Sequence, residues 1–271
     1  MGVIVTTGLP HSGTTILNLL VGSHSRHVAV GEAYGMLSSE EQLKKAFATG
    51  KRCSCGAPAP ECDLWGPFLR SAFRKNYRTH HERYRLFLEH AGELGVPVDS
   101  SKEIKGTEQE FTDARFVFVV KDVRSWAVAH QLRAQKQGRK PITLPRLFLR
   151  WHKNVHRRLR DLEGTRHTTV GYDPLAMRPA AVLPRVCDWL GIPFEDSMLT
   201  PDLRRSHALR GNGPLLYFKR SAVQYDDRWL SSNAWAPVSA LLPWVMWENT
   251  RLVWKTGGPG PVPTGVAAST R

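Results

Sequence analysis

Short apolar runs separated by longer segments of mixed polarity form the main pattern along this chain. Runs of this kind, bounded by glycine, proline or a polar residue, are typical of buried strands. The predicted strands cover residues 2–7, 96–99, 115–120 and 168–171. The third of them, RFVFVV, is apolar throughout after its arginine, which indicates a strand covered on both faces.

Between these strands, apolar residues recur at helical spacing. The predicted helices cover residues 12–23, 37–48, 64–94 (as one or two helices), 124–137, 144–162, 180–190 and 235–254. Gly191 follows the sixth of these, as expected where a helix ends in a left-handed residue. We predict a loop from Arg26 through Gly31 and Glu32.

This alternation of strands and helices predicts an α/β fold, with a central parallel sheet flanked by helices on both faces. A chain of 271 residues suits one large domain. We assign residues 1–256 to this domain. Residues 257–271 consist largely of Gly, Pro, Ala, Ser and Thr, and we expect them to form a disordered tail.

The polar segments that follow three of the strands are GLPHSGTT, DSSKE and KDVRS. Ligands of such sheets bind at the carboxyl ends of the strands. Because these three segments are rich in hydrogen-bond donors and follow parallel strands, we expect them to meet at one edge of the sheet and to form the binding site there.

The spacing of Gly8 and Gly13 is that of a phosphate-binding loop, but Thr14 stands where an ATPase or GTPase has its lysine. Backbone amides at a helix N-terminus, together with the hydroxyls of Ser12, Thr14 and Thr15, can hold an oxyanion. A ligand without a γ-phosphate and without Mg²⁺ fits this loop better than ATP does. The alternative is an ordinary strand-to-helix turn.

Charge and cysteine usage narrow the picture further. The chain has 38 Lys and Arg against 24 Asp and Glu, for a net charge of +14, which favours an anionic ligand. The basic residues are spread along the chain, which disfavours nucleic acid as a partner. We find no signal peptide and no apolar run long enough for a membrane span, and we predict a cytoplasmic protein.

Three of the four cysteines, Cys53, Cys55 and Cys62, lie close together in the sequence CSCGAPAPEC. This stretch lacks the usual Cys-x₂-Cys pairs of a zinc site and an evident fourth ligand, so we predict no bound metal. A local disulfide is the other possibility, which a reducing cytoplasm disfavours.

Taken together, these motifs resemble one known family across about residues 1–220. The matching stretches are GLPHSGTT with the following GE, CSCG…C, VDSSK, FVFVVKDVR, VGYDPLAMRPAAVLPRVCDWLGIPFED and HALRGN. They resemble the sulfotransferases that use 3′-phosphoadenosine 5′-phosphosulfate (PAPS), within the bacterial group related to tyrosylprotein and carbohydrate sulfotransferases.

The resemblance implies a P-loop-type fold and assigns roles to residues on either side of the phosphate loop. Ser12, Gly13, Thr14 and Thr15 match the loop that binds the 5′-phosphosulfate. His11 stands where the family usually has Arg or Lys; a protonated histidine could stabilise the sulfuryl and bridging oxygens if the anion raised its pKa. Lys102 matches a lysine that contacts the sulfuryl group.

The nucleotide's 3′-phosphate has a motif of its own in the family, an Arg followed eight residues later by Ser. Here Lys121 and Ala129 occupy these positions, so the charge is kept and one hydroxyl is lost. Arg124 supplements Lys121 or else forms an ion pair with Asp122. Arg210, in the glycine-rich stretch RGNG, reaches the 3′-phosphate from a flap.

Glu32 is the candidate base for the acceptor hydroxyl. The tyrosyl branch uses the second of two successive glutamates, whereas this chain has Ala33 there. A structural pairing with a loop arginine is the rival role for Glu32. The weaker candidates for the base are His80, His81 and His207.

The expected activity is transfer of the sulfuryl group from PAPS to a hydroxyl of a sugar, phenol, lipid or natural product, with no metal required. A P-loop nucleotide kinase is a second hypothesis, disfavoured by Thr14 and by the lack of a clear acidic magnesium ligand after a strand. A non-catalytic nucleotide-binding protein with a decayed site is a third, kept open by His11, Lys121 and Ala129. The expected partner is a small-molecule or glycan acceptor. Neither the individual acceptor nor the oligomeric state is predicted.

Overall fold

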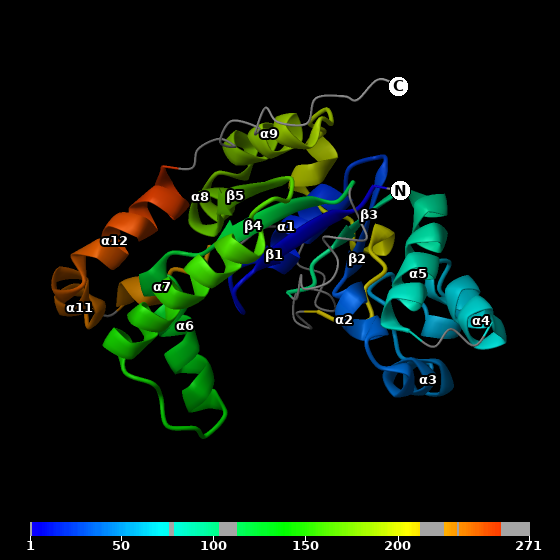
Figure 1. Cartoon of the computed structure of the whole chain (residues 1–271), viewed down its shortest axis with the longest axis horizontal. Helices are drawn as coiled ribbons and strands as arrows, with labels where there is room; N and C mark the ends of the chain where they lie inside the picture. Colours follow the sequence, from blue (N-terminus) through cyan, green and yellow to red (C-terminus); the bar gives the residue numbers. More distant parts are fainter. Residues whose placement is uncertain (1, 76–78, 103–112, 212–224, 232, 256–271) are drawn as a thin grey trace.

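The computed structural model describes residues 2–75, 79–102, 113–211, 225–231 and 233–255. At its centre is a five-stranded sheet of order β2-β3-β1-β4-β5, in which every neighbouring pair is parallel (Figure 1). The strands are β1 (Ile4–Gly8), β2 (His27–Gly31), β3 (Val96–Asp99), β4 (Arg115–Val120) and β5 (His167–Gly171). The predicted α/β fold with a central parallel sheet is confirmed.

The alternation of side chains along β4 builds the two halves of the core. Phe116, Phe118 and Val120 pack into one apolar cluster, whereas Val117 and Val119 pack into the other. Successive side chains of a strand point to opposite faces of the sheet, so a strand that is apolar throughout supplies both clusters. Helices therefore cover both faces, as predicted.

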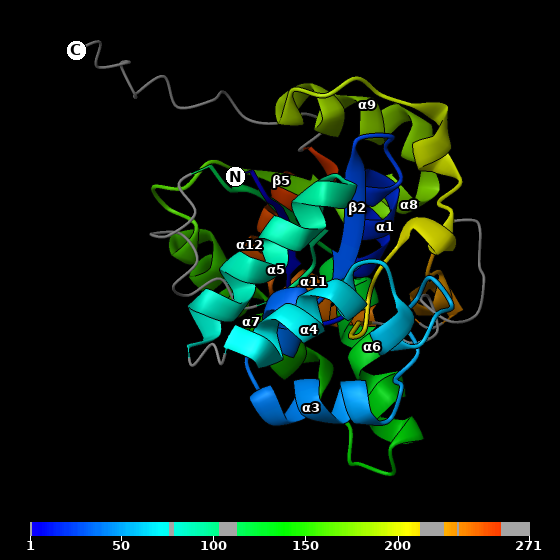
Figure 2. The same cartoon turned by 90° about the vertical axis from the view of Figure 1, so that its right-hand side faces the viewer.

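The cluster that contains Val117 and Val119 is covered by α1 (Thr14–Gly22), α8 (Tyr172–Met177), α9 (Pro179–Leu190) and the short turn η2 (Asp196–Leu199). The other cluster is covered by α2 (Ala33–Leu37), α3 (Glu40–Ala48), η1 (Ala59–Glu61), α4 (Trp65–Lys75), α5 (His80–Leu94), α6 (Val123–Lys136), α7 (Leu144–Asp161), α11 (Trp235–Leu241), α12 (Pro243–Asn249) and the π-helical turn η5 (Thr250–Trp254). Figure 2 shows α4 and α5 in front of β2. Two further turns, η3 (Leu203–Arg205) and η4 (Arg228–Ser231), lie in the later part of the chain.

One predicted loop is wrong, because residues 27–31 of the segment 26–32 form the edge strand β2. All five residues of β2 are buried, and the strand pairs with β3. Its other edge is covered by a later segment, since the backbone N–H of His207 donates to the carbonyl of Ala29 at 2.8 Å. The strand HVAVG thus depends on pairing with segments far along the chain.

Helix boundaries differ from the prediction where local caps or proline intervene. Residues 37–48 divide into the end of α2 and α3, which begins after the capping residue Ser39. Residues 64–94 form two helices, and a capping box of Thr79 and Glu82 starts the second of them, α5. Pro243 separates α11 from α12 within residues 235–254, because proline cannot continue a helix from the preceding turn.

Two sequence-based expectations concern the chain's ends and the membrane. The predicted tail, 257–271, lies outside the described residues, so the boundary at residue 256 stays a prediction. Among the helices that are described, none has the length and apolar character needed to cross a bilayer.

Candidate active site

The loops predicted to meet do so at the carboxyl edge of the sheet. β1 lies between β3 and β4, so the phosphate loop after β1 is flanked by the segment that starts at Asp99 and by the segment that starts at Lys121. Beyond β3, the edge strand β2 ends at Gly31 and brings Glu32 to the same edge. The sheet order thus sets Lys102 and Lys121 on opposite sides of the phosphate loop.

The phosphate loop presents an uncapped helix N-terminus. Gly13 adopts a left-handed φ of 90°, and no side chain caps the first turn of α1. A Cβ atom at Gly13 would lie 2.1 Å from the Tyr172 ring, so both the backbone and the packing require glycine there. Ser12 is 1 % exposed, and its Oγ has no hydrogen-bond partner among the described residues. Free amides and a buried, unpaired hydroxyl suit a bound oxyanion.

Bulky side chains hold this loop in place. The indole N–H of Trp126, on α6, donates to the carbonyl of Pro10 at 2.9 Å. At Gly8, a Cβ atom would lie 2.6 Å from the carbonyl oxygen of Val119, so β1 and β4 approach more closely than a side chain would allow. The oxyanion cradle is therefore built on the core of the sheet.

His11, at the tip of the loop, contacts a cation that was not anticipated from the sequence. Its Nε2 lies 3.1 Å from Nη1 of Arg133, on α6, and its ring meets that of His130 edge-on at 5.4 Å. Burial, followed by the positive charge of Arg133, lowers the pKa of His11 to about 4. Without a bound anion His11 is therefore neutral at pH 7, and the nearest fixed positive charge at the loop tip belongs to Arg133.

His11 also has a φ of 69°, a backbone conformation that residues other than glycine rarely adopt. Strained positions of this kind concentrate at functional sites, where the surrounding structure holds them. Arg133 could be placed here only by the packing of α6 against the loop, since nothing in the local sequence relates it to His11.

Glu32 lies between two of the predicted cations. Its Oε1 is 2.8 Å from Nζ of Lys102, and its Oε2 is 3.5 Å from Nε of Arg210. Arg210 also donates from Nη1 to the carbonyl of Gly35 at 2.9 Å. The structure thus brings together the candidate base, the candidate sulfuryl-binding lysine and the predicted flap arginine. The pairing of Glu32 with a loop arginine, the rival to a catalytic role, is present alongside the Lys102 contact.

A buried carboxylate positions this group. Asp99, at the end of β3, is fully buried and accepts hydrogen bonds from the backbone N–H of Tyr34 at 2.9 Å and of Ser101 at 2.6 Å, and from the Tyr84 hydroxyl at 3.0 Å. Ser101 Oγ in turn accepts from the backbone N–H of Gly35. Asp99 therefore ties the start of α2, next to Glu32, to the loop that carries Lys102.

Lys121 forms an ion pair on the other side of the phosphate loop. Its Nζ lies 2.8 Å from Oδ2 of Asp226 and 4.9 Å from the centre of the Tyr172 ring, and its side chain is 4 % exposed. Arg228 contacts the other oxygen of Asp226 at 2.6 Å. Burial works to raise the pKa of Asp226, but Arg228 and Lys121 together hold it well below its usual range. The lysine predicted to bind the 3′-phosphate is thus paired with the carboxylate of Asp226.

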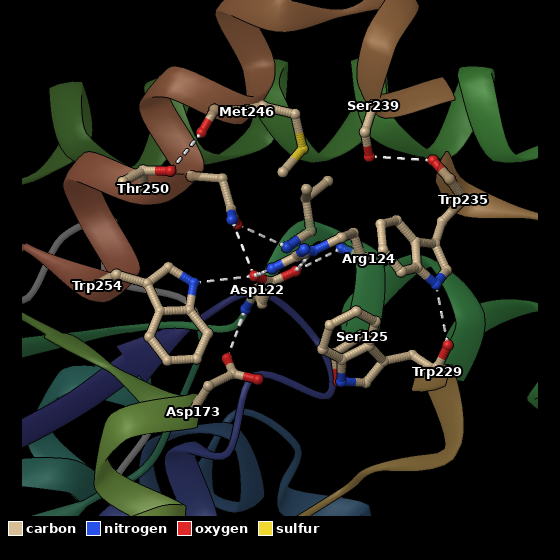
Figure 3. A network of polar contacts seen from close by, with 12 residues as sticks. Asp122, Arg124, Ser125, Asp173, Trp229, Trp235, Ser239, Met246, Thr250 and Trp254 are labelled. Carbon is tan, nitrogen blue, oxygen red and sulfur yellow. Dashed lines mark hydrogen bonds and ion pairs between the residues drawn. The ribbon is translucent and has the colours of Figure 1, made fainter. Parts of the chain in front are cut away.

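Arg124 takes part in a separate buried network (Figure 3). Its Nε and Nη2 donate to the two oxygens of Asp122 at 2.9 and 2.7 Å, and its guanidinium lies over the Trp229 and Trp235 rings. Asp122 also accepts from Asn249 and Trp254. This is the ion pair that was the alternative to phosphate binding by Arg124.

The histidines considered as weaker bases lie elsewhere. His80 Nε2 is 2.7 Å from the carbonyl of Tyr34, and His81 packs edge-on against the Tyr34 ring. His207 lies beside three cysteines, with its Nδ1 3.2 Å from Sγ of Cys62. None of these rings is in hydrogen-bond contact with the phosphate loop in the described part of the chain.

Comparison with known proteins bears on the family. A family model described as "Sulfotransferase family" matches residues 3–196. The chain belongs to the sulfotransferase family. The match includes the phosphate loop, Glu32, Lys102 and Lys121, and it ends before Arg210 and Asp226. No curated protein matches the sequence.

Two solved structures are similar in fold. The sulfotransferase domain from the curacin biosynthetic pathway has a TM-score of 0.58 at 17% identity, covering 89% of this chain and 97% of its own. The sulfotransferase domain from the Synechococcus PCC 7002 olefin synthase has a TM-score of 0.56 at 16% identity, covering 90% of this chain and 94% of its own. The fold of this sulfotransferase-family chain is thus shared over nearly the whole length of those domains.

Proposed function

We propose that this protein transfers the sulfuryl group of PAPS to a hydroxyl of an acceptor and releases adenosine 3′,5′-bisphosphate. The observation that carries the proposal is the phosphate loop without a lysine, in which a buried Ser12 hydroxyl lacks a partner among the described residues and lysines flank both sides. Such a loop suits a 5′-phosphosulfate, which has no γ-phosphate for a lysine to reach and no Mg²⁺ to hold.

In this reaction the acceptor oxygen attacks the sulfur, a new S–O bond forms, and the bond between sulfur and the bridging oxygen of the 5′-phosphate breaks. The electron pair of the broken bond passes to the phosphate. We assign the binding of the 5′-phosphosulfate to Ser12, Gly13, Thr14 and Thr15. Donors aimed at the oxygens that gain charge in the transition state contribute most to such a step.

Glu32 is assigned as the base that takes the acceptor's proton. Lys102 is paired with Glu32. An anionic donor offers Lys102 a second partner, and transfer of the ammonium group to the sulfuryl oxygens frees the carboxylate to accept the proton. Lys102 would thus exchange its ion pair with Glu32 for one with the sulfuryl oxygens as the donor binds.

The nucleotide's 3′-phosphate is assigned to Lys121, which must exchange Asp226 for the phosphate or share its charge between them. Arg210 lies at Glu32, so its proposed contact with the 3′-phosphate requires it to leave this carboxylate. Arg124 keeps its ion pair with Asp122 and lies over the rings of Trp229 and Trp235.

The kinase alternative is less well supported. A kinase needs a carboxylate free to bind Mg²⁺ near the phosphates. Asp122 directly follows the Lys121 position, but its oxygens accept hydrogen bonds from Arg124, Asn249 and Trp254. We propose that donor binding needs no metal, that the acceptor is a small molecule or a glycan, that nucleic acid is not a partner and that the protein is cytoplasmic.

Calorimetric titration of adenosine 3′,5′-bisphosphate in magnesium-free buffer, beside ATP with Mg²⁺, tests the proposal. We expect the bisphosphate to bind with an affinity that added Mg²⁺ does not change, and ATP with Mg²⁺ to bind weakly. Tight ATP binding that requires Mg²⁺, with no binding of the bisphosphate, would overturn the proposal in favour of a kinase.

A further inference from the structure

Three cysteines and one histidine converge beside the edge strand β2. The cysteines lie in the segment between α3 and α4, and the histidine follows η3. The Cys₃His cluster consists of Cys53, Cys55, Cys62 and His207. Their four ligand atoms all lie within 4.8 Å of one another. The Sγ atom of Cys62 is 3.6 Å from that of Cys53 and 3.9 Å from that of Cys55.

These separations match those of a tetrahedral metal centre. With metal–sulfur bonds of about 2.3 Å and metal–nitrogen bonds of about 2.0 Å, tetrahedral ligands lie about 3.8 Å apart for two sulfurs and about 3.5 Å apart for sulfur and nitrogen. The distance from Cys62 Sγ to His207 Nδ1 is 3.2 Å, within a few tenths of this value. A disulfide would need about 2.0 Å between two sulfurs, and all three thiols are free.

We propose that the Cys₃His cluster binds one Zn²⁺ ion as a closed, four-coordinate structural site. Three thiolates and an imidazole are the ligands that zinc prefers in structural sites. The four side chains supply all four positions of a tetrahedral site; Cys53 and Cys62 are each 1 % exposed, His207 is 8 % exposed and Cys55 is partly exposed. The site is separate from the phosphate loop and does not depend on the proposed reaction.

The backbone around the cluster is arranged to hold sulfur ligands. Gly56 adopts a left-handed φ of 101°, which closes the turn after Cys55. The N–H of Cys53 donates to the carbonyl of Ala57 at 2.8 Å, and the N–H of Gly56 donates to that of Cys53 at 2.9 Å. Backbone hydrogen bonds of this kind fix the loop that carries the cysteines, and so help to orient the ligands of a metal.

The histidine is fixed just as firmly. Its backbone N–H donates to the carbonyl of Ala29 on β2, and its carbonyl accepts from the indole N–H of Trp65 at 2.7 Å. Ser54 joins the two segments, since its Oγ donates to the carbonyl of Ser206 at 2.7 Å and accepts from the N–H of Ala208 at 2.8 Å. A bound ion would therefore link the cysteine loop to the segment around His207, which these hydrogen bonds already hold together.

The position of the cluster gives the ion a structural task. The segment that carries His207 continues to Arg210, whose carbonyl accepts from the N–H of Glu32 at 3.0 Å. A Cβ atom at Gly31 would lie 2.5 Å from Cβ of Ala208, so this segment packs tightly on the end of β2. Zinc at the cluster would hold this segment, and with it Arg210, against the loop of the candidate base.

Zinc content after expression with added ZnCl₂ and removal of free metal by gel filtration tests the proposal. We expect about one zinc per chain in the wild type. Cys62→Ser and His207→Ala should lose most of it, whereas Cys187→Ser, which removes a buried cysteine outside the cluster, should retain it. His207→Cys should also retain it, because a fourth thiolate can replace the imidazole. Co²⁺ in place of Zn²⁺ should show the absorption bands of a tetrahedral thiolate site.

Alkylation of the wild-type thiols keeps the test decisive if a variant fails to fold. Zinc should protect the cluster cysteines from iodoacetamide, and a strong chelator should expose them. A wild type without zinc, a disulfide between cluster cysteines under reducing conditions, or unchanged zinc in both Cys62→Ser and His207→Ala would overturn the proposal. None of these results depends on nucleotide binding, so the zinc site and the sulfotransferase reaction can fail separately.

Discussion

The ammonium group of Lys102 lies 2.8 Å from a carboxylate oxygen of Glu32, although the two residues are 70 positions apart. One was predicted to bind the sulfuryl group and the other to act as the base. Under the proposed function, this pair couples donor binding to activation of the base, because Lys102 exchanges Glu32 for the sulfuryl oxygens. Lys102 is about one-third exposed, so its side chain can move without disrupting the core.

Lys102→Ala should lower turnover by roughly 10²–10³-fold, as expected for the loss of a donor that stabilises the transition state. Single-turnover sulfuryl transfer from PAPS to an accepted phenol or sugar measures the effect. Lys44→Ala is a matched control, because Lys44 forms an exposed pair with Glu40 at 2.7 Å away from the site. Full activity in Lys102→Ala would show that the lysine does not touch the reacting group.

Anion binding should draw a proton onto His11. The ligand-free pKa of about 4 leaves the imidazole neutral at pH 7, and an adjacent phosphosulfate or phosphate raises it. If the pKa of His11 in the complex lies near or above 7, binding takes up protons at every pH between about 4 and that higher pKa. The affinity for the anion then falls as the pH rises through this range. Calorimetry with adenosine 3′,5′-bisphosphate in buffers of different ionisation enthalpy measures the uptake.

The control for His11 is the substitution of a permanent cation. His11→Arg should bind the bisphosphate without proton uptake, and a loss of rate at high pH in the wild type should disappear in the variant. Absence of proton uptake in the wild type would mean that His11 stays neutral and that Arg133 supplies the charge at the loop tip. Arg133→Ala should then weaken binding more than His11→Ala does.

Substitutions of Asp226 and of Lys121 should change the affinity for the 3′-phosphate in opposite directions. Lys121→Ala should weaken binding of the 3′,5′-bisphosphate by about 1.5–3 kcal/mol and affect 5′-AMP far less, because only the bisphosphate has the 3′ charge. Asp226→Asn should strengthen bisphosphate binding, since it removes the carboxylate that competes for Lys121. The exposed neighbour Asp227→Asn is the control. Equal losses for both nucleotides in Lys121→Ala would contradict the assignment.

Arg124→Leu should destabilise the protein by about 3 kcal/mol, because it leaves the buried Asp122 carboxylate without its cation. Urea unfolding followed by tryptophan fluorescence measures the change. Arg204→Leu is a close control, since Arg204 and Asp202 form the same pairing two residues apart at the surface. No measurable change is expected there, and an equal effect in both variants would show that burial of Asp122 is not the cause.

Local sequence was sufficient to predict the elements that build the sheet's centre. β1, β3 and β4 are short apolar runs, and they emerge as strands because both of their faces are buried. It was not sufficient for β2, whose pairing depends on β3 and on the segment around His207.

By itself, the sequence determined the α/β architecture, the loop after β1 and the placement of Lys102 and Lys121 after two strands that are consecutive in the chain, because each of these depends on local spacing and on a buried strand ending at a polar residue. Only the tertiary structure decided which charges meet: Glu32 with Lys102, Lys121 with Asp226, His11 with Arg133, and His207 with the cysteines. The last pair is separated by 145 positions. Side chains that far apart in sequence become neighbours only when the strands align in parallel and the later segments pack across the ends of the strands. No local sequence pattern can therefore predict the contact.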